Sequence, residues 1–180
     1  WRSSRIVANA GLTVRPVSGL SVQVTGNVRS GNSRSDYFKT KKYPNSVGEA
    51  SISFGETMNL SGNGIVNYEK SFGKHNINIM GGVTYEQSIT KSTSTGTARG
   101  FLSDVTETYD INAADTKGLP TSSYSDWKLL SFLGRANYNY DNRYLLTVNF
   151  RADGSSRYSK GNKWGYFPSA AFAWRASQED

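Results

Sequence analysis

Hydrophobic and polar residues alternate with a period close to two along most of this chain. In residues 20–29 the even positions are leucine, valine or glycine, and the odd positions are serine, glutamine, threonine, asparagine or arginine. Successive side chains of a β-strand point to opposite faces, so this period predicts strands with one apolar and one polar face. Helical periodicity is nearly absent, and we expect an all-β fold.

The alternation predicts about seven strands of roughly ten residues, arranged as an antiparallel meander. They cover approximately residues 6–14, 20–29, 58–69, 77–86, 130–140, 144–151 and 166–175. Short turns are expected near residues 15–19, 70–74 and 141–143, where proline, glycine, aspartate or asparagine occur.

Long polar segments near residues 30–55, 88–126 and 153–164 alternate with these short turns. Short turns at one end and long loops at the other are typical of a transmembrane outer-membrane β-barrel. The alternative is a soluble antiparallel sandwich, which buries its apolar faces against each other. Asparagine recurs on the polar face of many strands, which favours a barrel with a hydrated lumen.

An open set of seven strands leaves two edges without hydrogen-bonding partners, which is costly in a membrane. We therefore expect residues 1–180 to be a partial barrel domain whose remaining strands belong to a longer chain. The alternative is a complete eight-stranded outer-membrane barrel that acts as an adhesin or binding protein. That alternative requires one more strand, for which the segment from Phe101 to Ile111 offers room.

Composition excludes several classes of function. The chain has no cysteine and one histidine, so disulfides and ordinary zinc or copper sites are not expected. It lacks a phosphate loop and any Ser/His/Asp spacing, so we expect neither an enzyme nor a cofactor. Its longest apolar run, Ala170 to Trp174, is too short for a transmembrane helix.

The formal net charge of +7 raises the question of nucleic-acid binding. Basic residues are scattered, however, and only Lys39, Lys41 and Lys42 cluster. No recognition-helix pattern or aromatic RNA-binding motif is present, so no nucleic-acid partner is expected. Lipopolysaccharide phosphates are an equally simple partner for basic residues on the outer face.

The C-terminal part carries a specific set of motifs. They are Gly134-Arg135, Tyr138-Asn139-Tyr140, Arg143-Tyr144-Leu145-Leu146, Asp153-Gly154-Ser155-Ser156-Arg157, Trp164-Gly165-Tyr166-Phe167-Pro168-Ser169 and Ala173-Trp174-Arg175. Together they resemble the SusC/RagA family of TonB-linked outer-membrane transporters. Phe72-Gly73-Lys74-His75 in the middle of the chain also looks like this family. Tyr158 and Ala152 depart from the usual pattern.

The resemblance implies a 22-stranded barrel in the outer membrane of a Gram-negative bacterium. It also implies import of oligosaccharides or peptides, with a SusD-like lipoprotein as partner. Energy comes from TonB acting on a plug domain, which has no counterpart in these residues. Outer-membrane lipid and lipopolysaccharide would surround the barrel.

Aromatic residues in the long segments are candidates for contact with a ligand or partner, because flat rings stack on sugars and fill protein pockets. They are Tyr37, Tyr43, Tyr109, Trp127, Tyr158 and Trp164. The alternative is that they pack loops together or form the outer aromatic girdle, which for Trp127 and Trp164 is the stronger interpretation.

Four polar residues of the last strands are expected to face the lumen and to contact the plug or the substrate. They are Arg135, Asn137, Asn149 and Arg151. Residues 153–157 are predicted to form a tight polar turn, in which Asp153 pairs with Arg151 or Arg157. His75 is predicted to be a solvated turn residue.

Overall fold

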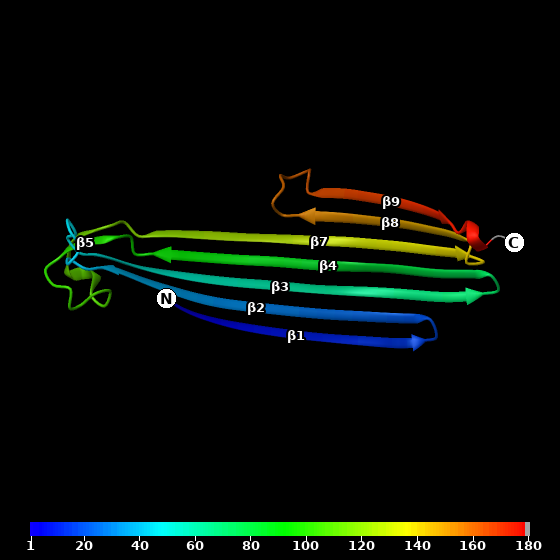
Figure 1. Cartoon of the computed structure of the whole chain (residues 1–180), viewed down its shortest axis with the longest axis horizontal. Helices are drawn as coiled ribbons and strands as arrows, with labels where there is room; N and C mark the ends of the chain where they lie inside the picture. The colour runs from blue at the N-terminus through cyan, green and yellow to red at the C-terminus, as the bar shows by residue number, and fades with distance from the viewer. Residues whose placement is uncertain (179–180) are drawn as a thin grey trace. The chain divides into compact units, whose positions relative to one another are not determined.

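A computed structural model describes residues 1–178, which form one antiparallel β-sheet (Figure 1). The long strands are β1 Arg2–Val17, β2 Leu20–Lys39, β3 Glu49–Phe72, β4 His75–Ser94, β7 Thr121–Tyr140, β8 Tyr144–Ser155 and β9 Trp164–Trp174. They are hydrogen-bonded in the order β1-β2-β3-β4-β7-β8-β9. The predicted all-β meander of seven main strands is confirmed.

The strands are much longer than the ten residues that the alternation predicts. β1 has 16 residues, β2, β4 and β7 have 20 each, and β3 has 24, whereas only β8 and β9 are close to the expectation, with 12 and 11. The predicted long loops shrink accordingly, because backbone pairing continues where the apolar alternation has already stopped. A transmembrane strand needs only about 9–11 residues, so the extra length is polar extension.

Short elements occupy the segment between β4 and β7. They are β5 Ala98–Phe101, the 3-10 helix η1 Ile111–Ala113 and β6 Ala114–Lys117, and a second 3-10 helix, η2 Ala176–Gln178, follows β9. β5 pairs antiparallel with β3 and with β6.

The additional strand that the eight-stranded alternative requires is not formed between Phe101 and Ile111. Phe101 ends β5, and bends and turns follow it. Local side chains hold the backbone there: Ser103 Oγ accepts from the N–H of Val105 at 3.2 Å, and Asp110 Oδ1 accepts from the N–H of Asn112 at 3.1 Å. Such side-chain bonds compete with a strand ladder.

Three short turns are formed where they are predicted, although the first two are shorter than expected because residues 15–17 and 70–72 belong to strands. Residues 18–19, 73–74 and 141–143 connect β1 to β2, β3 to β4 and β7 to β8. In the last turn Asp141 and Asn142 have φ of 52° and 53°, and the N–H of Arg143 bonds to the carbonyl of Tyr140 at 2.9 Å. Aspartate and asparagine tolerate this left-handed backbone, which a type I′ hairpin turn requires at both central positions.

Contacts divide the chain into two compact units. We call Trp1–Val7, Arg29–Asn59 and Ser88–Asp126 the loop-end unit, and Ala8–Val28, Leu60–Gln87 and Trp127–Asp180 the turn-end unit. The loop-end unit contains a small apolar core. Its members are Ala50, Ala98, Phe101 and Ala114, with Phe38 and Ile111 packed against them.

The turn-end unit, in contrast, leaves large apolar side chains exposed. On β8, Leu146, Val148 and Phe150 are 41%, 45% and 47% exposed, and on β9 Phe172 is 67% exposed. A soluble sandwich would bury these rows beneath a second sheet, but residues 1–178 form a single sheet. The sandwich alternative is therefore not supported. Within residues 1–178, no helix is long and apolar enough to cross a membrane.

Candidate functional site in the polar face of the last strands

The candidate site is the polar face of β7, β8 and β9 in the turn-end unit. Regular antiparallel register places Arg135 opposite Asn149, Asn137 opposite Thr147, and Asn149 opposite Ser169. Side chains that are directly opposite in two paired strands share a face. The four residues that the sequence predicts to face a lumen therefore share one face, and we call them the polar row. Within it, Arg151 lies opposite two apolar residues, Leu133 and Phe167.

Hydrogen bonds join this row across all three strands. Arg135 Nε donates to Asn149 Oδ1 at 2.6 Å, and Asn149 Nδ2 donates to Ser169 Oγ at 3.2 Å. Thr147 Oγ1 donates to Asn137 Oδ1 at 2.9 Å. The row presents a guanidinium, amides and hydroxyls whose orientation is fixed by neighbours, which suits recognition of polar ligand groups.

Arg151 extends the row toward the loop-side end of β8. Its Nε donates to both carboxylate oxygens of Asp153, at 2.8 and 2.9 Å, and its Nη2 lies 3.5 Å from Ser131 Oγ. Ser131 is fully buried, whereas the Arg151 side chain is 51% exposed. Asp153 and Ser131 therefore hold part of the Arg151 guanidinium in place, and the rest of the guanidinium stays accessible.

The predicted pairing of Asp153 with Arg151 is confirmed, but the predicted tight turn at residues 153–157 is only partly formed. Asp153, Gly154 and Ser155 continue β8 and pair with β7, and the turn begins at residue 156. On the other side of β8, Trp164 of β9 lies opposite Gly154, and its ring covers the position where a Cβ of residue 154 would be. The contact of Ser131 with Arg151 is not visible in the sequence, because it depends on the register that places Ser131 opposite Asp153.

Trp127 and Arg157 lie beyond the end of the regular β7–β8 register. The guanidinium carbon of Arg157 is 4.7 Å from the centroid of the Trp127 ring. The N–H of Ser156 bonds to the carbonyl of Lys128, and Ser156 Oγ accepts from the N–H of Lys128, at 2.9 and 2.8 Å. Contact between an arginine and an aromatic face fixes both groups, so this pair provides a preorganised flat surface.

Three of the six candidate aromatic residues are not loop residues, which corrects the sequence analysis. Tyr37 lies in β2, Trp127 lies in β7 and Trp164 is the first residue of β9. The reason is the same as for the strand lengths: polar strand extensions carry no alternation from which a boundary could be read. Tyr43, Tyr109 and Tyr158 do lie outside the strands, and they are 60%, 86% and 63% exposed.

Trp164 lies on the apolar face. Its ring stacks on Phe132 at 5.9 Å, and Tyr166 stacks on Phe150 at 6.3 Å. Phe150 and Phe132 alternate with the polar row on the same strands, so Trp164 occupies the position expected of an aromatic girdle residue.

His75 is not the solvated turn residue that the sequence predicts. It begins β4 and is half-buried; its Nδ1 is 2.7 Å from the hydroxyl of Tyr138, and its ring stacks on Phe72 at 5.0 Å. Tyr140 contributes another ring at 5.0 Å. Pairing of β4 with β7 brings these residues together, and no local sequence pattern reveals that.

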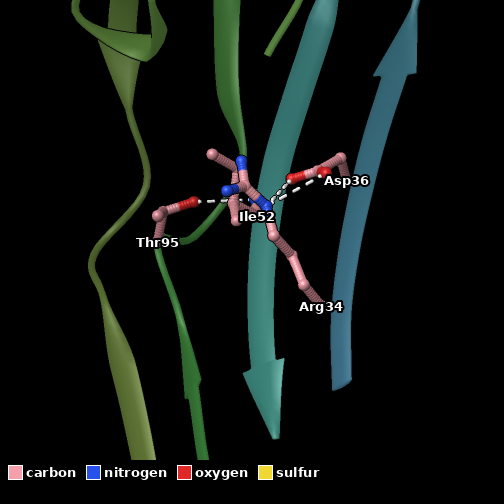
Figure 2. Close-up of polar contacts among 4 residues, drawn as sticks. All are labelled: Arg34, Asp36, Ile52 and Thr95. Carbon is pink, nitrogen blue, oxygen red and sulfur yellow. Dashed lines mark hydrogen bonds and ion pairs between the residues drawn. The ribbon is translucent and has the colours of Figure 1, made fainter. Parts of the chain in front are cut away.

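In the loop-end unit, polar contacts fix the place where β4 separates from β3 (Figure 2). The N–H of Ile52 donates to Thr95 Oγ1 at 3.1 Å, and the N–H of Thr95 donates to the carbonyl of Ile52 at 3.0 Å. Figure 2 also shows Arg34 directed at both oxygens of Asp36, which lie 2.8 and 3.1 Å from its Nε. Arg34 additionally lies over the ring of Phe54, at 5.4 Å.

The strands with one exposed apolar face and one hydrogen-bonded polar face define the class of protein: a segment of the wall of an outer-membrane type β-barrel. Between β1 and β9 the sheet is open, so the alternative of a closed eight-stranded barrel is not formed by residues 1–178. No group of three potential metal-ligating side chains occurs in that range either.

No protein-family model matches the chain. It is 32% identical over 171 residues to TonB-dependent receptor P3 of Formosa agariphila, covering 91% of this chain and 17% of that protein. It is 38% identical over 122 residues to TonB-dependent receptor SusC of Bacteroides thetaiotaomicron, covering 68% of this chain and 12% of that protein. The chain thus spans less than a fifth of the length of these curated relatives.

Among solved structures, the RagAB peptide transporter matches 99% of this chain and 21% of its own chain, with a TM-score of 0.88 and 22% identity. At that identity the match establishes the fold. Sequence and fold together show that the chain is a SusC/RagA-like segment of a TonB-dependent receptor, which confirms the predicted resemblance. TonB-dependent receptors are not enzymes, in agreement with the prediction that this chain catalyses no reaction.

Proposed function

We propose that residues 1–180 are a partial barrel domain in the wall of an outer-membrane transporter of a Gram-negative bacterium. In this proposal the complete barrel has 22 strands and imports oligosaccharides or peptides, with energy that TonB delivers through a plug domain. The similarity to TonB-dependent receptors supports the transporter class.

One observation carries the proposal. Adjacent residues of β8 have opposite surroundings: Val148 is 45% exposed on an apolar row, whereas Asn149 is bonded to Arg135 and Ser169. An exposed apolar row is favourable only against another apolar phase. Acyl chains supply that phase on one side, and the hydrated lumen accommodates the polar row on the other.

Single-cysteine labelling tests this arrangement, because the chain has no cysteine of its own. In the full receptor, freed of any other cysteine, a fluorophore at V148C should be quenched by nitroxide-labelled lipid and not by a water-soluble quencher. A fluorophore at N149C should show the opposite pattern. Equal quenching of both positions by the water-soluble reagent would contradict a transmembrane wall.

The loop-end unit is the candidate surface for a SusD-like lipoprotein. Its small core holds a loop from which Leu102, Val105 and Tyr109 project, each at least 86% exposed. Lys41 holds this loop with two hydrogen bonds. The backbone N–H of Lys41 donates to Asp104 at 3.2 Å, and the Nζ of Lys41 donates to the carbonyl of Leu102 at 3.0 Å. Apolar groups exposed on an ordered loop are typical of protein contact sites.

Co-purification tests this partner surface. Tyr109→Ser combined with Val105→Ser in the full receptor should reduce the amount of lipoprotein retained with it about tenfold, as expected for the loss of one or two interface anchors. Tyr158→Ser is the comparison, since this proposal assigns the partner contact to the loop-end unit and not to Tyr158 in the turn-end unit, and it should retain the partner. Unchanged retention in the Tyr109 and Val105 double variant would remove these residues from the interface.

A further inference from the structure

A groove of about 510 Å³ lies in the loop-end unit, across the first three strands. Arg5 of β1, Arg29 of β2, and Thr57 and Asn59 of β3 line it, together with Trp1 and Ser3. All six occupy odd-numbered positions, and so alternate with the apolar residues Ile6, Val28 and Met58 of the same strands. The groove therefore belongs mainly to the polar side of these strands.

The charge in the groove is purely positive. Its lining includes two arginines and no aspartate or glutamate. Within residues 1–178 the side chains of Arg5 and Arg29 have neither an ion-pair nor a hydrogen-bond partner. Arg34 and Arg99 of the same unit differ, since Arg34 pairs with Asp36 at 2.8 Å and Arg99 with Glu49 at 3.4 Å.

Glycine at position 31 keeps the groove open. A Cβ there would meet nothing closer than the carbonyl of Ser4 at 3.6 Å, which is an ordinary contact, so packing does not require glycine. A glycine inside a strand costs stability and often marks the close approach of a ligand. Gly55 is different, because its Cβ would lie only 2.7 Å from Ser33 Oγ.

We propose that this groove binds the acidic group of an anionic oligosaccharide, a carboxylate or sulfate ester, during passage along the wall. Guanidinium groups match both anions with paired N–H donors. Hydroxyls of Ser3 and Thr57 and the amide of Asn59 suit sugar hydroxyls, and the Trp1 ring in the lining offers a stacking face. A peptide would instead call for apolar side-chain pockets, whereas Trp1 is the only large apolar side chain in the lining of this groove.

This inference rests on the proposed function and narrows its substrate class. The experiment uses the full detergent-purified receptor and isothermal titration calorimetry, with tetragalacturonate, neutral galactotetraose and tetraglutamate as probes. We expect tetragalacturonate to bind more tightly than the other two. Arg5→Gln and Arg29→Gln should each weaken its binding about tenfold, and the double variant more, because each removes a charge-assisted contact.

Arg2→Gln is the matched control, since it removes the same charge from the opposite side of β1 and should leave binding unchanged. Gly31→Val should weaken binding of tetragalacturonate by filling the groove. Equal binding of the neutral probe would overturn the anionic subsite, and equal binding of tetraglutamate would overturn the oligosaccharide class. If Arg2→Gln weakens binding of tetragalacturonate as much as Arg29→Gln does, the attraction comes from the net charge of the protein and not from the groove.

Failure here is distinguishable from failure of the transporter proposal. If Val148 and Asn149 show the opposite quenching patterns described above while tetragalacturonate does not bind, the wall assignment holds and only the subsite is refuted. If the quenching patterns are equal, the wall assignment itself fails.

Discussion

The two compact units are made from the same long strands, yet they obtain their stability in different ways. Among the described residues of the turn-end unit, Ala152 is the only buried apolar one, and large side chains such as Phe150 and Phe172 are exposed. In the loop-end unit Ala50, Ala98 and Phe101 are almost fully buried. The first unit requires an external apolar phase to cover its surface, whereas the second contains its own core.

The difference teaches that one part of a strand can present an exposed apolar surface while another part of the same strand is covered by protein. In the proposed barrel wall the exposed apolar rows of the turn-end unit border lipid, and hydrogen bonding between the strands continues beyond those rows. Outside that range the sheet needs protein packing, which β5, η1 and β6 supply. We therefore expect loss of a buried apolar side chain to destabilise the loop-end unit most, and a charge placed on an exposed apolar row to destabilise the turn-end unit most.

The largest expected effect is loss of the loop-end core. Phe101 is 2% exposed and meets Phe38 edge-to-face at 5.9 Å. Phe101→Ala should reduce the local stability of residues 98–117 by about 3–5 kcal/mol, since it removes buried area and leaves a cavity. Hydrogen exchange should accelerate there while the turn-end unit keeps its protection. The neighbouring Leu102, 87% exposed, gives the control Leu102→Ala, which should change little. Equal exchange in both variants would show that the loop-end unit has no core of its own.

The next effect uses two adjacent alanines of β9. Ala170 lies opposite Val148 on the apolar row, and Ala171 lies opposite Thr147 on the polar row. Ala170→Arg should destabilise the receptor in bilayers by about 2–4 kcal/mol, because it places a charge against acyl chains. Ala171→Arg should cost much less. Urea-induced unfolding in lipid vesicles measures the difference, and two equal losses would argue that both faces meet the same medium.

These comparisons also show what the sequence can predict. The order of the strands, their apolar and polar faces and the three tight turns follow from alternation and turn residues, and all are observed. The strand ends and the contacts of Ser131 and His75 do not, because they depend on cross-strand register. The strand positions of Tyr37 and Trp127 do not follow from the sequence for the same reason. The shared face of the polar residues follows from the alternation, but their hydrogen-bond partners do not.

A smaller effect tests how closely the turn between β1 and β2 is packed. Gly19 has φ of 80°, and its carbonyl accepts from the N–H of Glu69 at 2.8 Å. A Cβ on Gly19 would lie 2.1 Å from the carbonyl oxygen of Glu69. Gly19→Ala should therefore destabilise the turn-end unit by about 1–3 kcal/mol, through backbone strain and displacement of β3.

Gly73 provides the matched control for this turn. It has φ of 56°, but a Cβ there meets nothing within 4 Å. Gly73→Ala should cost about 1 kcal/mol, from the left-handed backbone alone. Thermal unfolding of the two variants in detergent should thus place Gly19→Ala below Gly73→Ala; the reverse order would mean that the contact with Glu69 does not constrain the turn.

The smallest effect depends on pH and concerns the turn between β7 and β8. Lys74 Nζ lies 2.7 Å from Asp141 Oδ2, and Arg143 Nε lies 3.7 Å from the same oxygen. The hydrogen bond from Lys74 lowers the pKa of Asp141 below its ordinary value of 3.8; attraction to Lys74 and Arg143 adds to this, and partial loss of hydration opposes it. A carboxyl whose folded pKa is lowered stabilises the fold fully above its ordinary pKa and loses that contribution as the pH falls through the folded value.

The stability difference between the wild type and Asp141→Asn, which keeps the left-handed turn, should therefore be constant from pH 7 to pH 5 and shrink below pH 3.8. Urea unfolding at each pH measures it, and a difference that grew on acidification would show that Lys74 does not stabilise the ionised carboxylate.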